Sequence, residues 1–483
     1  MAVEITGDRT TARVLADESL VSEECLEQVR TLTDHPAFTE PIRVMPDAHW
    51  GAGSPVGFSM PLPDAVVPNV VGVDVGCGMA AANLGSDLPL ADDDAERERR
   101  VREAVPMGRA VHDEPVRTLE QFPFERANRV FDRFADRFED RFGRRVEPRY
   151  GFDGYDAAYV ASLCDRVLAG RSAGRDRVER SVGTLGGGNH FVEFARAQRS
   201  WDYWLIVHSG SRYLGLAVAE YWQDRAGEFR AADQIRAAIP AAYEPYLRFD
   251  PETVSDGELV AWVTGDRPYI DRERLRAELD GSEIERAFRE LGALGSDLDP
   301  TGPEEFDAAL AHLEGGEADG YYVDMLFAQQ YARWNRATMV DRICETLGVE
   351  PTDRFQSVHN YVDFRDLTIR KGATPAREGQ RLVIPLNMGE GSLLARGKGN
   401  AAWNETAPHG AGRRMGRREA HETLDVAEFD EAMSEVYSES VGEATLDEAP
   451  AAYKSADAIT DALEPTADVV DHLHPVHNLK ATE

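Results

Sequence analysis

The segment Val73-Asp74-Val75-Gly76-Cys77-Gly78-Met79 lies near the end of a region, 43–84, that is rich in Gly and Val. Short apolar runs alternate with glycines there, which predicts strands joined by tight turns. Asp74 and Cys77 are three residues apart, and the glycines beside them allow turns that would aim both side chains at one point. Because a single cysteine is more often a buried thiol, this spacing alone leaves a metal site and a core cysteine both open.

Outside this region, the spacing of apolar residues predicts a mixture of strands and helices. We expect a strand and a short helix near 22–31 within the first 40 residues, and a helix over 122–142, where four phenylalanines share one face. Further expected elements are a buried strand at 204–208, an amphipathic helix at 322–347 that Gly348 stops, and strands within 381–394 and 466–480. This irregular order favours the α+β class over a repeating βαβ sheet.

The stretch 240–320 differs from the rest of the chain in composition. It is rich in Asp, Glu, Gly and Pro, carries few motifs and has helical patterns such as 271–292. We therefore expect one large domain over 1–483 with a peripheral acidic insertion at about 240–320.

The charge balance is strongly acidic. Of 483 residues, 87 are Asp or Glu and 53 are Lys or Arg, which gives a formal net charge of −34. Net charge alone therefore excludes nonspecific binding to nucleic acid or anionic lipid. Apolar residues make up 42% of the chain, enough for an ordered core. The composition is typical of a protein from a salt-loving organism, and an acidic metal-storing protein is the alternative.

Several absences in the sequence favour the cytoplasm. The chain does not start with basic residues before an apolar run, so we expect no signal peptide. Apolar stretches stay well short of 18 residues, so we expect no membrane span. The four cysteines are scattered and predict no disulfide framework.

Only four basic residues are lysines, and all of them follow residue 370: Lys371, Lys398, Lys454 and Lys480. A compact ammonium is not equivalent to the planar guanidinium that replaces it elsewhere. We therefore expect some of these lysines to contact phosphate or nucleotide. The alternative is that turns simply tolerate lysine.

Three other segments place metal-ligating side chains at expected strand ends. Gly186-Gly187-Gly188-Asn189-His190-Phe191-Val192-Glu193 has three glycines that would let a loop approach a ligand closely. His208 ends the buried strand, and His359 precedes Asn360. Each histidine alone is typical of an ordinary polar residue, but together they predict a metal site. Cys, His and Asp favour zinc by ligand softness, while manganese or a two-metal site stays open.

The segment Ala407-Pro408-His409-Gly410-Ala411-Gly412-Arg413-Arg414 predicts phosphoryl chemistry. A neutral imidazole can attack phosphorus, and neighbouring guanidinium and backbone N–H groups can stabilise the charge that develops. A polar turn is the alternative. Glycine-rich turns at 387–392 and 396–399 could also bind phosphate, although neither matches a P-loop.

Taken together and in order, these segments resemble the RtcB family of tRNA-splicing RNA ligases. The resemblance runs from about 40 to 480 and leaves out the acidic stretch. It also rests on Met45-Pro46-Asp47-Ala48-His49-Trp50-Gly51, Val207-His208-Ser209-Gly210-Ser211-Arg212, Arg370-Lys371-Gly372-Ala373 and Glu448-Ala449-Pro450-Ala451-Ala452-Tyr453-Lys454.

The resemblance implies a ligase that joins 3′-phosphate and 5′-hydroxyl RNA ends with GTP and two manganese ions. In such enzymes a histidine, here His409, is guanylylated and passes the guanylate to the RNA 3′-phosphate. The 5′-hydroxyl then attacks and releases GMP, and a 2′,3′-cyclic phosphate is opened first. The implied partners are RNA, such as tRNA halves, and the activating protein archease.

The resemblance also implies roles for individual residues. The implied manganese ligands are Asp74, Cys77, His190, His208 and His359. The implied guanylate contacts are Asn189, His190, Phe191, Glu193, His359, Asn360, Pro385, Asn387, Met388, Ser392, His409, Gly410, Ala411, Gly412, Tyr453 and Lys480. We expect RNA or phosphate contacts from Arg212, Lys371, Arg413 and Arg417. Two positions depart from the family pattern: Leu386-Asn387 replaces its usual Gly-Ser, and Gly416-Arg417 its usual Ser-Arg.

Two other functions remain alternatives at this point. One is a metal-dependent phosphodiesterase, or a specialised RNA-repair relative, that opens cyclic phosphates without efficient joining. The other is a non-catalytic RNA-binding protein on an inherited fold, which the complete set of ligand residues disfavours.

Overall fold

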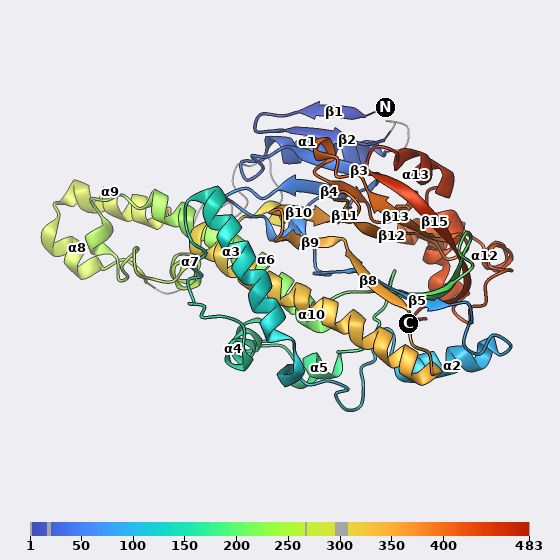
Figure 1. The fold of residues 1–483 in the computed structure, drawn as a ribbon. Helices are drawn as coiled ribbons and strands as arrows, with labels where there is room; N and C mark the ends of the chain where they lie inside the picture. The colour runs from blue at the N-terminus through green and yellow to red at the C-terminus, as the bar shows by residue number, and fades with distance from the viewer. Residues whose placement is uncertain (1, 17–20, 266–267, 295–307, 483) are drawn as a thin grey trace.

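Two large β-sheets and a set of long helices make up the computed structural model, which describes residues 2–16, 21–265, 268–294 and 308–482 (Figure 1). This mixture confirms the predicted α+β class. The strands are β1 (Val3–Thr6), β2 (Thr11–Val14), β3 (Ile42–His49), β4 (Val56–Pro61), β5 (Gly78–Gly85), β6 (Phe191–Ala197), β7 (Tyr203–Ser209), β8 (Asp353–Val358), β9 (Asn360–Asp363), β10 (Thr368–Lys371), β11 (Ala373–Pro375), β12 (Arg381–Asn387), β13 (Gly391–Gly397), β14 (Thr406–Pro408) and β15 (Ala467–Leu479).

The helices gather mainly in the first two thirds of the chain. They are α1 (Glu23–Asp34), α2 (Asp94–Ala104), α3 (Phe124–Phe142), α4 (Ala157–Val167), α5 (Arg175–Arg180), α6 (Arg212–Ala238), α7 (Asp256–Thr264), α8 (Arg272–Glu278), α9 (Gly281–Gly292), α10 (Gly315–Leu347), α11 (Arg417–Thr423), α12 (Val426–Ala432) and α13 (Ala456–Ala462). Short 3₁₀ turns, including Glu443–Glu448 and Pro450–Ala452, connect them to the strands. Among the described residues, no helix combines the length and apolarity that crossing a membrane requires.

The two large sheets meet at the link between β8 and β9. One sheet has the strand order β1-β2-β3-β4-β10-β9, and the other β12-β13-β15-β6-β7-β5-β8. Since β8 is the edge of one sheet and β9 the edge of the other, His359 between them lies at the junction. In the register of the second sheet, Gly78 of β5 pairs with Val358 of β8, which brings Cys77 beside His359.

The register of the central strands brings His208 close to the same point. His208 of β7 pairs with Met79 of β5 on one side and with Phe191 of β6 on the other. The residues just before β5 and β6 are Cys77 and His190. Antiparallel pairing therefore gathers the strand ends that the sequence predicted as ligand positions.

Helix α10 is longer and more buried than the sequence predicted. It begins at Gly315 instead of 322, and Gly348 ends it in the left-handed conformation, as expected. The predicted amphipathic pattern is wrong, because polar residues such as Asp319 and Asp324 are buried along it. Arg144 pairs with Asp319, and Arg166 with Asp324. Apolar periodicity does not detect a core helix whose buried residues include ion-paired acids of this kind.

Smaller differences concern element boundaries. The first 40 residues contain a β1–β2 hairpin instead of one strand, and α1 extends to Asp34. The helical pattern at 271–292 forms two helices, α8 and α9, separated near Asp280. Asp271 caps the start of α8, and the backbone is extended at Leu279 and Asp280, which separates α8 from α9.

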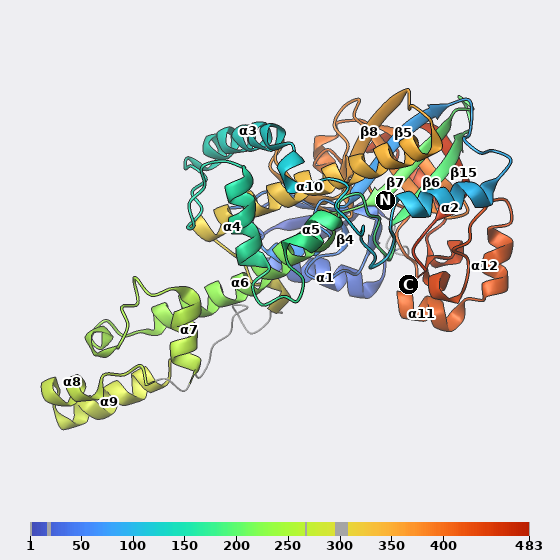
Figure 2. The ribbon, with the colours of Figure 1, turned by 90° about the horizontal axis from the view of Figure 1, so that it is seen from below.

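Helices α7, α8 and α9 project away from the rest of the protein in both views (Figures 1 and 2). They share a small apolar cluster that includes Leu259, Leu275 and Leu291. At their base, Asp256 pairs with Arg225 and Arg236 of α6. We propose that this arm is the acidic peripheral insertion expected at about 240–320.

We predict that Asp324 is a major contributor to stability. Its buried carboxylate accepts hydrogen bonds from the side chains of Tyr150, Tyr159, Trp222 and Arg166 at 2.8–3.0 Å. Asp324→Ala leaves these donors unpaired, so the free energy of unfolding should fall by roughly 3–5 kcal/mol.

The matched control for this prediction is Asp341→Ala. Asp341 pairs with Arg354 at the surface and its side chain is 43% exposed, so its loss should cost less than about 1 kcal/mol. Denaturant unfolding at one fixed salt concentration measures both variants. Equal losses would contradict the role given to Asp324.

Candidate metal and nucleotide site

The five predicted metal ligands meet at the junction of the two sheets. The Cys77 Sγ atom lies 3.1 Å from His208 Nε2 and 3.5 Å from His190 Nε2. These three donor atoms lie within 4.8 Å of one another and all three residues are buried. Asp74 Oδ2 is 2.8 Å from His190 Nε2, and His359 Nε2 is 3.2 Å from His208 Nε2.

The protonation of these groups suits a cation. The ring of His208 contacts the carbonyl of Asn189 through Nδ1 at 3.1 Å, which assigns the proton to Nδ1 and leaves a lone pair on Nε2. Burial and neighbouring histidines lower the pKa values of His208 and His359 well below the ordinary range, so both rings are neutral. Burial opposes the ionisation of Asp74, but His190 and Arg212 lower the pKa of this carboxyl well below its ordinary value.

The protonation of Cys77 does not suit a cation in the same way, because burial and then Asp74 raise the pKa of its thiol. Thiolate is the form that binds a metal, so binding must release a proton there. The donor atoms of Cys77, His190 and His208 face one point, and the carboxylate of Asp74 and the imidazole of His359 lie beside them. This donor set fits a divalent metal. The predicted residues therefore fit the group that the sequence implied.

Asp47 holds His409 on the other side of the cluster. Its Oδ2 atom accepts a hydrogen bond from His409 Nδ1 at 2.7 Å and another from the His409 backbone N–H at 3.2 Å. The His409 ring centroid is 4.6 Å from that of His359, the nearest metal-ligand candidate. The sequence does not predict this role, although Asp47 stands in one of the motifs, because nothing in the motif indicates which residue it contacts.

The turn that carries His409 packs directly on the strand that carries Asp47. Gly412 has a φ of +73°, and a Cβ atom there would lie 2.3 Å from the carbonyl oxygen of Asp47. Only glycine fits such an approach. The Ala411 N–H donates to the carbonyl of Pro385, and the Lys454 N–H donates to that of Gly412.

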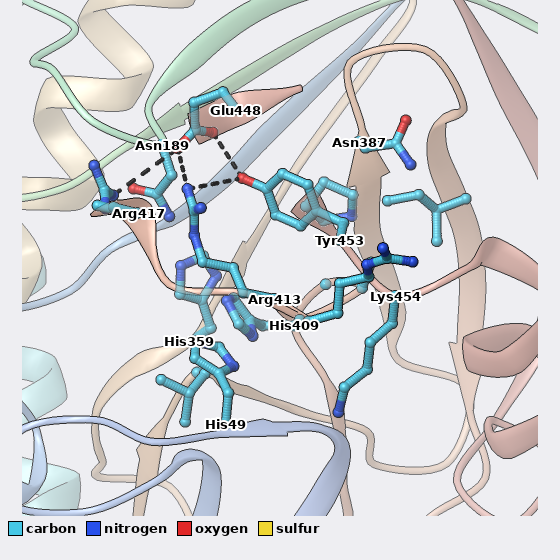
Figure 3. A pocket seen from close by; sticks show the side chains of 18 of the residues that line it. His49, Asn189, His359, Asn387, His409, Arg413, Arg417, Glu448, Tyr453 and Lys454 are labelled. Carbon is cyan, nitrogen blue, oxygen red and sulfur yellow. Dashed lines mark hydrogen bonds and ion pairs between the residues drawn. The ribbon is translucent and has the colours of Figure 1, made fainter. Parts of the chain in front are cut away.

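Most of the predicted guanylate contacts line one cavity of about 1070 Å³ that also contains His409 (Figure 3). His190 and Ser392 do not line it, and His190 instead lines an adjoining cavity of about 290 Å³ with Asp74 and Arg212. The predicted contacts that line the large cavity are Asn189, Phe191, Glu193, His359, Asn360, Pro385, Asn387, Met388, His409, Gly410, Ala411, Gly412, Tyr453 and Lys480.

Glu448 organises one wall of this cavity, as Figure 3 shows. Its carboxylate accepts hydrogen bonds from Tyr453 Oη and Lys480 Nζ, each at 2.7 Å, and from Arg413. Burial opposes ionisation, but Lys480 and Arg413 lower the pKa of Glu448 to about 2. The sequence does not predict a role for Glu448. Its bonds fix the Tyr453 ring and already pair the charges of Arg413 and Lys480.

Glu193, which also lines this cavity, differs from Glu448 in protonation. Burial raises the pKa of its carboxyl to about 8, while Asn478, Lys480 and Ser392 lower it less strongly. The amide of Asn478 donates to Glu193 Oε2 at 2.9 Å. This carboxyl is therefore mostly protonated at neutral pH, in the absence of a ligand that donates hydrogen bonds to it.

The four positions expected to contact phosphate have different surroundings. Arg212 is partly buried and donates to the carbonyl of Gly108 and the hydroxyl of Thr184. Arg417 lines the large cavity, is about half exposed and lies 3.3 Å from Asp447. Lys371 also lines it, and its ammonium donates to the carbonyls of Ala52 and Ser54. The phosphate contacts of all four, Arg413 included, stay predictions.

Of the two departures from the family pattern, Asn387 has a clear local role. Its Oδ1 atom accepts the N–H groups of Gly389 and Glu390 at 3.0 and 2.9 Å, and its amide donates to the Glu390 side chain. It therefore shapes the β12–β13 turn. Gly416 is the N-cap of α11.

Two residues of α10 hold the ligand loops together, a role that the sequence does not predict. The Asn335 amide donates to the carbonyls of Thr184 and Gly210 at 3.2 and 3.1 Å, and its oxygen accepts the N–H of Gly183. Arg336 donates to the carbonyls of Gly76 and Ser209 at 2.6 and 2.7 Å. Their polarity on a buried helix was the available signal.

The chain is similar to known ligases over most of its length. A family model described as tRNA-splicing ligase RtcB matches residues 28–248 and 284–481. The RNA-splicing ligase RtcB of Escherichia coli K12 is 26% identical over 479 residues, which cover 94% of each chain. The tRNA-splicing ligases RtcB of Nanoarchaeum equitans and Aeropyrum pernix are 23% and 26% identical and cover 92% and 93% of this chain and 90% of their own.

We predict that Cys77 ligates a divalent metal through sulfur. Cobalt(II) added to metal-free protein should produce an intense sulfur-to-metal charge-transfer absorption, which Cys77→Ser removes. Cys344→Ser is the matched control, because Cys344 is buried in a separate apolar cluster. An unchanged absorption in Cys77→Ser would show that the sulfur is no ligand.

We predict that Glu448 stabilises the fold in a pH-dependent way. Its folded-state pKa of about 2 lies below its ordinary value of 4.5, so its contribution is complete above about pH 4.5 and is lost as the pH falls toward about 2. Glu448→Gln should lower the free energy of unfolding at pH 7 by roughly 3–5 kcal/mol, because Lys480 and Arg413 lose a buried partner.

Denaturant unfolding of parent and variant from about pH 7 to pH 3 measures this effect, and the difference should shrink on acidification. Glu464→Gln is the control, since the Glu464 side chain is 82% exposed and pairs with Lys398. A difference that grows below pH 4.5 is the opposite of the expected result.

Proposed function

The chain belongs to the RtcB family of tRNA-splicing ligases, and from this premise we propose that it joins 3′-phosphate or 2′,3′-cyclic-phosphate RNA ends to 5′-hydroxyl ends with GTP and manganese. The observation that carries the proposal is the position of His409. One ring nitrogen is bound to Asp47, and the ring lies against His359 at the edge of the metal-ligand cluster. The histidine proposed as the nucleophile and most of the residues proposed to hold the metal line the same cavity.

Asp47 prepares His409 to act as the nucleophile. A carboxylate at Nδ1 favours the tautomer with its proton on that nitrogen, so that Nε2 carries the lone pair. Nε2 would attack the α-phosphorus of GTP, forming a nitrogen–phosphorus bond as pyrophosphate leaves. The second bond from Oδ2 to the backbone N–H holds the ring and its turn in one orientation.

The later steps transfer the guanylate to RNA. An oxygen of the RNA 3′-phosphate would attack the phosphorus of the guanylylated His409, which releases the imidazole and leaves a diphosphate-linked guanosine on the RNA. The 5′-hydroxyl of the second RNA end would then attack the RNA phosphorus, and GMP leaves. A bound divalent metal would supply charge neutralisation between the reacting phosphates.

Cys77, His190 and His208, with Asp74 and His359 beside them, are the residues that would hold the metal. Ligand softness alone favours zinc for such a set. We propose manganese because the family resemblance implies it, and because cellular availability as well as affinity decides which metal a site contains.

Glu193 and Tyr453 are suited to hold guanine. The N1 and N2 groups of guanine are hydrogen-bond donors, which a carboxylate at Glu193 could accept. Burial keeps this carboxyl mostly protonated in the absence of a ligand. The two donors of guanine would lower its pKa, so guanine binding would favour the ionised form. Tyr453, fixed by Glu448, would offer a ring for stacking.

We also propose that the enzyme works in a cytoplasm of high salt. The excess of carboxylates over basic groups favours a cytoplasm of high salt, where self-repulsion is screened. RNA, such as tRNA halves, would be the substrate, and archease is the partner that the family resemblance implies.

Labelled GTP tests the proposal directly. With manganese and molar salt, the parent protein should form an acid-labile GMP adduct that His409→Ala lacks. Asp47→Asn should form it about 10²- to 10⁴-fold more slowly, because the amide no longer fixes the reactive tautomer. His421→Ala is the matched control, since His421 is a partly exposed histidine of α11.

Failure to form an adduct at saturating GTP would sink the ligase mechanism. The phosphodiesterase alternative then predicts that RNA with a 2′,3′-cyclic phosphate is still opened to a monophosphate. If that substrate is also unchanged, a non-catalytic RNA-binding role is the reading that survives.

A further inference from the structure

Trp50 is an unusually exposed aromatic residue on the wall of the cavity that contains His409. Its side chain lines that cavity, and 52% of the residue's surface is exposed to solvent. Among the described residues, three other large apolar side chains are exposed to a similar degree: Val73, Trp201 and Val470. None of these three lines the large cavity. An indole left in water beside a polar cavity indicates a binding surface.

The backbone on both sides of Trp50 is firmly held. Before it, the ammonium of Lys454 donates to the carbonyls of Pro46 and Ala48 at 3.0 and 2.8 Å. After it, the side chain of Gln28 donates to the carbonyl of Gly51 at 2.6 Å. Lys371 holds the next turn through Ala52 and Ser54. These contacts fix the backbone that carries the indole, so little backbone entropy is lost when a ligand stacks on it.

A free cation lies on the same cavity. Arg414 is exposed and lines the cavity, and within the described part of the chain its guanidinium forms no ion pair. Arg413 and Arg417 beside it pair with Asp447 and Glu448. In a chain with a net charge of −34, a guanidinium left without a carboxylate is available to a phosphate.

The cavity also has room for more than a nucleotide. Sites for one small ligand occupy about 300–1,000 Å³, and this cavity measures about 1070 Å³. Glu193, Tyr453 and Glu448 form the part where we place guanine. Trp50 comes from a separate segment, the end of β3 and the turn after it. Unpaired RNA is bound mainly by aromatic stacking of bases together with cationic contacts to the backbone.

We propose that Trp50 is the stacking platform for an unpaired base of the RNA strand that carries the reacting end, and that Arg414 contacts a phosphate of the same strand. This inference rests on the proposed function for the identity of its ligand. It assigns the RNA to the Trp50 side of the cavity and the guanylate to the Tyr453 side. Two stacking rings on different segments would keep the two nucleobases apart.

The affinity for a short single-stranded RNA with a 3′-phosphate and a fluorescent 5′ label tests the inference, measured by anisotropy. Trp50→Ala should weaken binding about fivefold to a hundredfold, the range for loss of one base stack. Trp50→Phe should restore most of the loss, because a phenyl ring also stacks. Trp201→Ala, which removes an indole that is 61% exposed and lies outside the cavity, should bind like the parent.

A second RNA, with abasic sites at its last two positions, separates stacking from other contacts. The parent and Trp50→Ala should bind this RNA equally, since no base is left to stack. Arg414→Ala should instead weaken both RNAs by the same factor and reduce the dependence of affinity on salt. A Trp50→Ala loss that persists on abasic RNA, or that Trp201→Ala matches, would overturn the inference.

This experiment is independent of the ligation chemistry. A parent protein that forms no GMP adduct, yet binds RNA through Trp50 as described, would contradict the proposed function and leave the stacking platform standing. A parent that forms the adduct but shows no loss of RNA affinity in Trp50→Ala would contradict the platform alone.

Discussion

The hydrogen bonds that Asn335 and Arg336 donate from α10 to the ligand loops are the interaction on which the site depends. The metal-ligand candidates come from the ends of different strands, so their loops expose backbone carbonyls that strand pairing cannot satisfy. An unpaired buried carbonyl costs free energy comparable to a lost hydrogen bond. Two adjacent side chains of one helix satisfy the carbonyls of Gly76, Thr184, Ser209 and Gly210. The position of α10 therefore determines whether the donor atoms can meet.

A second set of hydrogen bonds holds the turn that carries His409. The turn with this histidine touches β3 through Asp47, β12 through Pro385 and the C-terminal region through Lys454. Lys454 donates from its backbone to Gly412 and from its side chain to Pro46 and Ala48. His409 is thus held by contacts from both sheets, and these contacts form without a ligand.

The sequence predicts the residues that gather at the site better than it predicts what holds them. Cys77, His190, His208 and His359 are identifiable because each stands beside Gly, Asn or Ser at a predicted strand end. Asp47, Glu448 and Asn335 are not, because each acts through a partner that the chain brings close only by folding. Asn335 contacts Gly183, more than a hundred residues away, and no local pattern reports that contact.

The same reasoning explains the fold-level differences. Helix α3 was predictable, because its phenylalanines repeat at helical spacing and pack on one side. The start of α10 was not, because the buried acids Glu317 and Asp319 lie in its first turns, where partly buried arginines pair with them. Apolar periodicity detects burial of apolar groups and does not detect burial of ion pairs.

The surroundings of the four lysines have a practical consequence for handling the protein. Lys371 and Lys454 bind backbone carbonyls, and Lys480 binds the buried carboxylate of Glu448. Lys398 instead pairs with Glu464 and Asp468, whose side chains are 82% and 72% exposed, and it does not line the cavity. Among the lysines, Lys398 is therefore the one whose modification would leave the lining of the cavity unchanged. A dye or a solid support could be attached there with the cavity that contains His409 left open.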